Sequence, residues 1–66
     1  MKVHFDKSSD ALYFRLDDSK IVESEEVQPG VILDYNEKKY VIGVEILNVK
    51  ERVSEASLKE MTFEIG

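Results

Sequence analysis

The chain has 66 residues, no cysteine and a formal net charge of −5. A chain this short buries only about 60% of the surface that its unfolded form exposes, so we expect one small domain, residues 1–66, with a marginal core. Without cysteine, neither a disulfide nor a thiolate metal site can stabilise the fold, and self-association as a homodimer is the remaining means. The acidic balance disfavours nucleic acid and anionic lipid as partners, and a small basic protein is the easier partner if the chain binds a macromolecule. An acidic surface that serves only solubility is the favoured alternative.

The N-terminal residues lack the apolar run of a signal peptide, and no stretch approaches the roughly 18 apolar residues of a membrane span. We therefore expect a cytoplasmic protein that does not enter a membrane.

Two alternating segments at the N-terminal end predict a first β-hairpin. They are joined by the polar loop 7–10, and pairing that sets Val3 opposite Phe14 and Phe5 opposite Leu12 gathers the apolar side chains on one face. The other face then carries His4 opposite Tyr13.

Residues 21–27 alternate poorly and carry several carboxylates, which predicts a short or irregular edge strand whose charges discourage further pairing. Pro29 and Gly30 follow. Proline has no backbone donor and glycine tolerates unusual dihedral angles, so this pair predicts a turn or bulge.

The longest apolar alternation lies in residues 30–47 and predicts a second, stronger hairpin. A turn at 36–39 sets Tyr35 opposite Tyr40, Leu33 opposite Ile42 and Val31 opposite Val44, which places all six side chains on one face. Asp34 and Glu45 interrupt the apolar pattern and are explained if they face outward from a one-sided sheet.

After Asn48 the apolar residues no longer share one helical stripe, which predicts two short helical pieces broken near Ser54. Ser54 or Ser57 can cap the second piece. Residues 62–65 alternate once more, so a last short strand is possible in the same sheet or across a dimer. The predicted fold is α+β, with two consecutive antiparallel β-hairpins in a small meander sheet and short C-terminal helical segments.

Catalytic and cofactor chemistry finds little support in this sequence. One histidine and no cysteine argue against catalytic metal sites and nucleophilic sites, and no glycine-rich phosphate loop or calcium-loop spacing occurs. We therefore predict no catalytic residue, no metal ligand and no cofactor. A solvated edge without a site is the favoured explanation of the densest acidic group. If a binding site exists, this group supplies its candidate residues: Glu23, Glu25, Glu26, Asp34 and Glu45.

Four blocks carry a resemblance to a known family: D-A-L-Y from Asp10, E-S-E-E-V from Glu23, P-G-V-I-L-D-Y from Pro29, and G-V-E-I-L from Gly43. Their order and spacing resemble the small prokaryotic domain-of-unknown-function family 2283 over about residues 3–53. The resemblance implies a compact β-rich unit with a helical tail and carries over no catalytic residue. Some members are thought to be encoded beside small toxin-like proteins, which implies by analogy an antitoxin-like binding role.

Two functional hypotheses follow. The first is a non-enzymatic protein-interaction module, indicated by the negative charge, the missing catalytic groups and a fairly apolar outer face of the second hairpin. That face carries Ile32, Val41 and Leu47, and it is a candidate interface if the short helices do not cover it. The second is a small-molecule or metal-binding domain whose site forms at a homodimer interface, where His4 and carboxylates from two chains converge.

Overall fold

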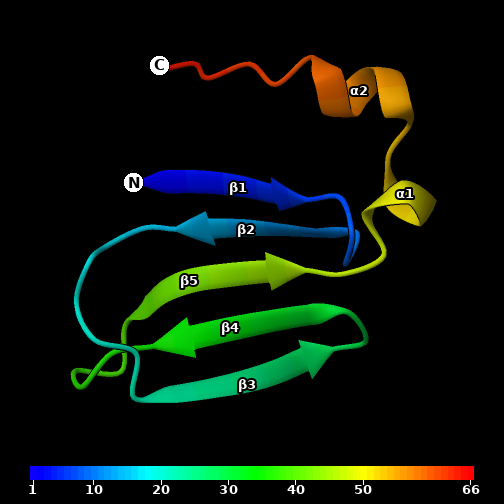
Figure 1. Cartoon of the computed structure of the whole chain (residues 1–66). Coiled ribbons are helices and arrows are strands. Elements are labelled where there is room, and N and C mark those ends of the chain that lie inside the picture. Colours follow the sequence, from blue (N-terminus) through cyan, green and yellow to red (C-terminus); the bar gives the residue numbers. More distant parts are fainter.

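The computed structural model describes residues 1–66 as one five-stranded antiparallel sheet followed by two short helices (Figure 1). The strands lie in the order β1-β2-β5-β4-β3. Their bounds are β1 Lys2–Asp6, β2 Ala11–Arg15, β3 Glu23–Gln28, β4 Val31–Tyr35 and β5 Val41–Ile46, and the helices are α1 Val49–Arg52 and α2 Glu55–Lys59. The predicted α+β class, with hairpins and short C-terminal helices, is confirmed.

The N-terminal hairpin joins the sheet through β5, the last strand in the sequence. β3, β4 and β5 form a meander, and β2 lies beside β5, with Phe14 opposite Val44 and Tyr13 opposite Glu45. The connection after β2 therefore passes the end of the sheet to reach the far edge, and β5 becomes the central strand (Figure 1).

The register of the first hairpin is confirmed, with Val3 opposite Phe14 and His4 opposite Tyr13. Its loop is stabilised by the Asp6 carboxylate, which accepts hydrogen bonds from the Ser8 backbone N–H at 3.0 Å and the Ser8 hydroxyl at 2.8 Å. Asp10 closes the loop in the left-handed region at φ 53°. Aspartate tolerates this conformation better than most residues.

The predicted register of the second hairpin is wrong by two residues. Leu33 lies opposite Val44 rather than Ile42, and Val31 lies opposite Ile46 rather than Val44. A shift of two residues leaves every side chain on its original face, so alternation alone cannot distinguish the two registers. An irregularity then pairs Tyr35 with Val41, and Tyr40 lies in the loop with 67% of its surface exposed.

The turn between β4 and β5 explains this offset. The Asn36 side-chain oxygen accepts hydrogen bonds from the backbone N–H groups of Lys38 at 3.0 Å and Tyr40 at 3.1 Å. Lys39 adopts φ 67°. Asparagine favours such turns because its short side chain reaches backbone donors two residues on.

The irregular edge strand and the turn after it are confirmed. All six residues of β3 are exposed, and its register shifts between Glu26 and Gln28. Gly30 has φ 81°, and its N–H donates to Glu26 Oε2 at 3.1 Å. Glycine adopts this dihedral without the penalty that a Cβ atom would incur.

The helical break at Ser54 is also confirmed. Ser54 Oγ accepts the Ser57 N–H at 3.1 Å, so Ser54 is the cap of α2. The start of α1 is held by Asp10, whose carbonyl oxygen accepts the Val49 N–H and whose carboxylate accepts the Lys50 N–H, each at 3.2 Å.

The segment after α2, residues 60–66, contains neither helix nor strand, so the possible last strand does not form within this chain. In Figure 1 this segment runs back toward the N-terminus. No helix is both long and apolar enough to cross a membrane.

Candidate functional site

The two faces of the sheet differ in chemistry. The strand registers place one set of alternating side chains on what we call the apolar face: Val3, Phe5, Leu12, Phe14, Val31, Leu33, Val44 and Ile46. The opposite set forms the polar face: Lys2, His4, Tyr13, Arg15, Ser24, Glu26, Ile32, Asp34, Gly43 and Glu45.

A closed hydrogen-bond cluster lies at the centre of the polar face. Asp34 is only 8% exposed, and its two carboxylate oxygens accept hydrogen bonds from Tyr13 Oη at 2.9 Å and Ser24 Oγ at 2.6 Å. Asp34 lies in β4, Tyr13 in β2 and Ser24 in β3, so the cluster spans four neighbouring strands of the sheet, β2, β5, β4 and β3. A buried carboxylate is tolerated only when its oxygens are paired, so Asp34 requires both hydrogen bonds. Through them the cluster joins the N-terminal hairpin to the β3–β4 half of the sheet.

Gly43 leaves the space in which this cluster forms. A Cβ atom at Gly43 would lie 2.6 Å from Tyr13 Oη and 2.7 Å from Asp34 Oδ2, both closer than van der Waals contact allows. The glycine is therefore required by the close approach of two side chains above the strand rather than by a turn.

Arg15 extends the cluster to the connection between β2 and β3. Its Nε donates to the Asp17 carbonyl at 2.6 Å, its Nη2 to the Ser19 carbonyl at 2.5 Å, and its Nη1 lies 3.5 Å from Tyr13 Oη. No buried side-chain nitrogen or oxygen in the chain lacks a partner. The polar cluster thus satisfies itself and acts as a structural tie between strands.

The five acidic candidates do not form one group. Glu23 and Glu25 are exposed at the β3 border of the apolar face, because Glu25 lies opposite Leu33. Glu26 and Glu45 lie on the polar face, and Asp34 is enclosed in the cluster.

His4 is exposed on β1 and takes no part in the polar cluster. The Tyr13 hydroxyl, from the residue opposite it, donates to Asp34. No three His, Asp or Glu side chains come close enough together to hold a metal ion. A ligand site between two copies would therefore need their polar faces to meet at His4.

Two exposed aspartates, Asp6 at the end of β1 and Asp17 in the β2–β3 connection, have pKa values below the usual range. The pKa of Asp6 is lowered first by the hydroxyl of Ser8 and then by the backbone N–H groups of Ser8 and Ser9. The pKa of Asp17 is lowered first by the hydroxyl of Ser19 and then by its backbone N–H, which donates at 3.0 Å. Both shifts arise from loop hydrogen bonds that favour the charged carboxylate.

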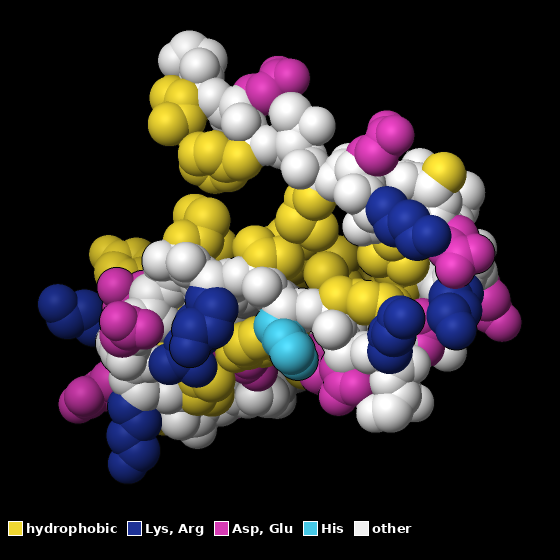
Figure 2. Space-filling view, turned by 45° about the horizontal axis from the view of Figure 1, so that its top comes forward, with side chains coloured by type: hydrophobic (Ala, Val, Ile, Leu, Met, Phe, Trp, Pro, Cys, Tyr) yellow, Lys and Arg dark blue, Asp and Glu magenta, His cyan; other side chains and the backbone are white.

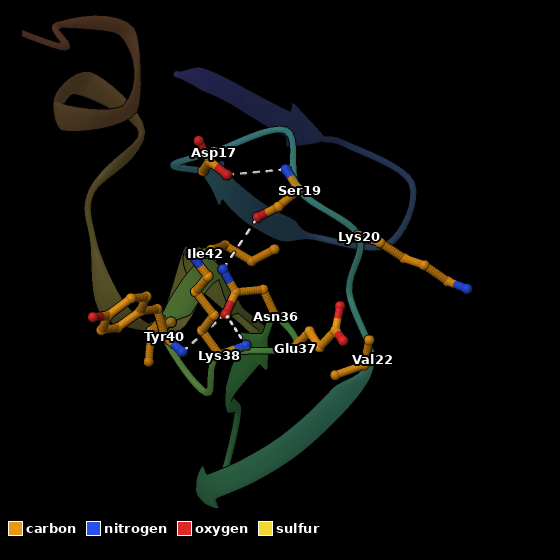
Figure 3. Close-up of a pocket in the computed structure, with 10 residues that line it drawn as sticks. Asp17, Ser19, Lys20, Val22, Asn36, Glu37, Lys38, Tyr40 and Ile42 are labelled. Carbon is orange, nitrogen blue, oxygen red and sulfur yellow. Dashed lines mark hydrogen bonds between the residues drawn. The ribbon is translucent and has the colours of Figure 1, made fainter.

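An open depression lies between the β2–β3 connection and the β4–β5 turn (Figure 3). Asn36 Nδ2 donates to Ser19 Oγ at 3.2 Å across it, and this bond joins the two loops. Figure 3 shows the Lys20 side chain directed away from the other lining residues. The side chains of Asp17, Ser19 and Asn36 are engaged within the two loops, and the exposed charged side chains of Lys20, Glu37 and Lys38 make no hydrogen bond.

The apolar face is the surface that the chain leaves incomplete. Only three hydrophobic residues in the whole chain are buried: Ala11, Ile42 and Val49. Seven of the eight residues of the apolar face are half-buried, Val3 is 42% exposed, and Leu16, which follows β2, is also 42% exposed. Figure 2 shows hydrophobic side chains gathered in a hollow between the sheet and the C-terminal segment.

Sequence reasoning missed both features of the site. The polar cluster depends on β2 lying near β4, which no local pattern indicates. The uncovered face had a signal in the sequence, because two helices of nine residues together are too short to cover five strands.

The fold and its surfaces define a small antiparallel β-sheet protein with one self-satisfied polar face and one open apolar face. The chain belongs to the family described as protein of unknown function DUF2283, which residues 2–50 match. No curated protein and no solved structure matches the chain. The matched residues include the whole sheet and the first half of α1. Each of the four sequence blocks that resemble the family supplies one residue of the polar cluster: Tyr13, Ser24, Asp34 and Gly43.

Proposed function

We propose that this chain is a non-enzymatic protein-interaction module that associates through its apolar face. The observation that carries this proposal is the contrast between the two faces. The buried polar groups of the polar face all have partners, whereas the apolar side chains remain in contact with solvent. Removing apolar surface from water contributes about 25 cal/mol per Å² in favour of a complex, before the entropic and desolvation costs of association are subtracted.

The acidic edge strand gives the module a preference for basic partners. Every residue of β3 is exposed, and its outer backbone edge pairs with no other strand. The carboxylates of Glu23, Glu25 and Glu26 attract positive charge and speed its association, most strongly at low salt. Capture of a small basic protein, in the manner of an antitoxin, fits this edge.

Charge reversal tests the role of the edge. The wild-type tagged chain is used to capture proteins from its native cells, and the captured protein is then titrated against purified variants. Reversal to lysine at the three β3 glutamates should weaken binding at low salt at least tenfold, and the loss should shrink as salt rises.

The matched control reverses the same number of charges outside the sheet and outside the C-terminal segment, at three exposed glutamates: Glu37, Glu51 and Glu55. This control should retain the partner, because the net charge changes equally while the edge does not. Equal weakening by both triple variants would contradict a specific role for β3. Failure to capture any protein would remove the support for a basic partner.

A further inference from the structure

We infer that the apolar face is covered by a second copy of this chain, so that two five-stranded sheets pack face to face in a symmetric dimer. The inference rests on the proposed function and names the partner at that surface. It follows from the area of the chain, its layers and the position of its C-terminal segment.

The chain exposes more surface than a compact monomer of its mass. Its accessible surface is 5377 Å² and its mass is 7.6 kDa. A folded monomer of that mass exposes about 4,300 Å². The excess of about 1,100 Å² exceeds the roughly 800 Å² per partner that a stable interface buries. The radius of gyration, 12.8 Å, is also larger than the roughly 11 Å of a compact chain of this length.

The chain lacks a second layer of its own. A sheet with one apolar face must pack that face against another layer, either helices or a second sheet. Here α1 buries only Val49, and α2 buries no residue. A second copy supplies a five-stranded layer of the same dimensions, and two sheets whose apolar faces meet pack about 10 Å apart.

The C-terminal segment adds to the same interface. Its apolar residues are largely exposed, with Met61 at 57%, Phe63 at 76% and Ile65 at 85%. Figure 2 shows hydrophobic side chains of this segment turned toward the apolar side chains of the sheet across a hollow. A second sheet that occupies the hollow would bury both sets at once.

The centre of the apolar face is uncharged. The eight residues that define the apolar face include none that is charged, and Glu23 and Glu25 lie at its β3 border. Charged residues at the border and apolar residues at the centre are the usual arrangement of an interface. A two-fold dimer requires the same patch on both copies, and this face meets that requirement.

Light scattering during size exclusion tests the inference on the purified chain alone. One chain has a mass of 7.6 kDa, and the wild type should have twice that mass. Val3→Lys and Leu16→Lys place a charge where the single chain is already 42% exposed, so each copy should still fold. Each variant should raise the dissociation constant of the dimer about 100-fold, because the dimer loses two buried apolar side chains.

The control is His4→Lys, which adds a positive charge to the same strand on the opposite face. It should remain a dimer. Equal dissociation by His4→Lys and Val3→Lys, or a wild type that is monomeric at 100 μM (about 100-fold above a micromolar dissociation constant), would overturn the inference. A monomeric wild type that still captures a different protein through the apolar face would retain the proposed function and refute only the second copy.

A second measurement needs no substitution. In a mixture of ¹³C-labelled and unlabelled wild-type chains, isotope-filtered NOE spectra should show methyl contacts between copies at Leu33 and Val44, near the centre of the apolar face. Contacts confined to polar-face residues such as Ile32 would overturn the inference even if the variants failed to fold.

Discussion

Replacement of Gly43 by alanine tests the polar cluster directly. A Cβ atom at this position would lie 2.6 Å from Tyr13 Oη, 2.7 Å from Asp34 Oδ2 and 3.2 Å from Asp34 Cβ. Asp34 is buried and its side chain is short, so it cannot simply move into solvent. The Tyr13–Asp34 hydrogen bond should break or lengthen.

The magnitude follows from two opposing effects. Losing a hydrogen bond to a carboxylate costs about 1.5–3 kcal/mol. Alanine recovers about 0.4–1 kcal/mol, because it restricts the unfolded chain more than glycine does. The net loss of unfolding free energy should be about 1–2 kcal/mol, and in a domain of this size the melting temperature should fall by roughly 4–16 °C.

The assay is thermal and urea unfolding followed by circular dichroism, at one protein concentration because association also affects stability. Gly66→Ala is the control, since nothing lies within 4 Å of a Cβ atom there. In a Tyr13→Phe background, which removes one of the two clashing oxygens, Gly43→Ala should cost about 1 kcal/mol less than in the wild type. A fully additive double variant, or a Gly43→Ala chain as stable as the wild type, would refute the steric reasoning.

Two further predictions concern the loops. Asp10 combines φ 53° with hydrogen bonds to the start of α1. Asp10→Asn should be nearly neutral, Asp10→Gly should lose about 1 kcal/mol of cap energy, and Asp10→Ala should lose a further 1 kcal/mol or so from backbone strain, as measured by urea unfolding. Equal stability of the three variants would contradict this ranking. The pKa values of Asp6 and Asp17 are lower in the folded chain than in the unfolded chain. Their contribution to the unfolding free energy is therefore fully present above the unfolded pKa near 3.9 and is lost as the pH falls through the lower folded pKa. Unfolding free energy measured from pH 6 to pH 2 should therefore decrease below about pH 4, and Asp17→Asn should make that decrease shallower; an unchanged slope would count against the Ser19 hydrogen bonds.

The local elements of the fold were predictable because each is determined by neighbouring residues. Alternation places Val3 and Phe14 opposite each other across a short polar loop, and the structure has this pairing. The same reasoning placed the turn at Gly30 and the helical break at Ser54. In each case the side chain acts on backbone groups within a few residues.

What the sequence could not predict depends on contacts between distant segments. The register of the second hairpin is offset by two because the Asn36 side chain sets the turn while both registers leave the faces unchanged. Asp34 was expected to face outward, and it does lie on the polar face, but it is buried there by Tyr13 and Ser24. That burial requires the placement of β2 beside β5, which is a property of the topology.

The position of β5 at the centre of the sheet also sets an order of events for the newly made chain. β1 to β4 are translated first, yet β2 and β4 have no common neighbour until Val41–Ile46 has left the ribosome. An isolated two-stranded hairpin has only marginal stability in water, so the apolar side chains of both hairpins stay exposed until β5 is available. The sheet then closes in one step around a strand that pairs on both sides, and a chain arrested before Val41 should stay open to proteases and chaperones.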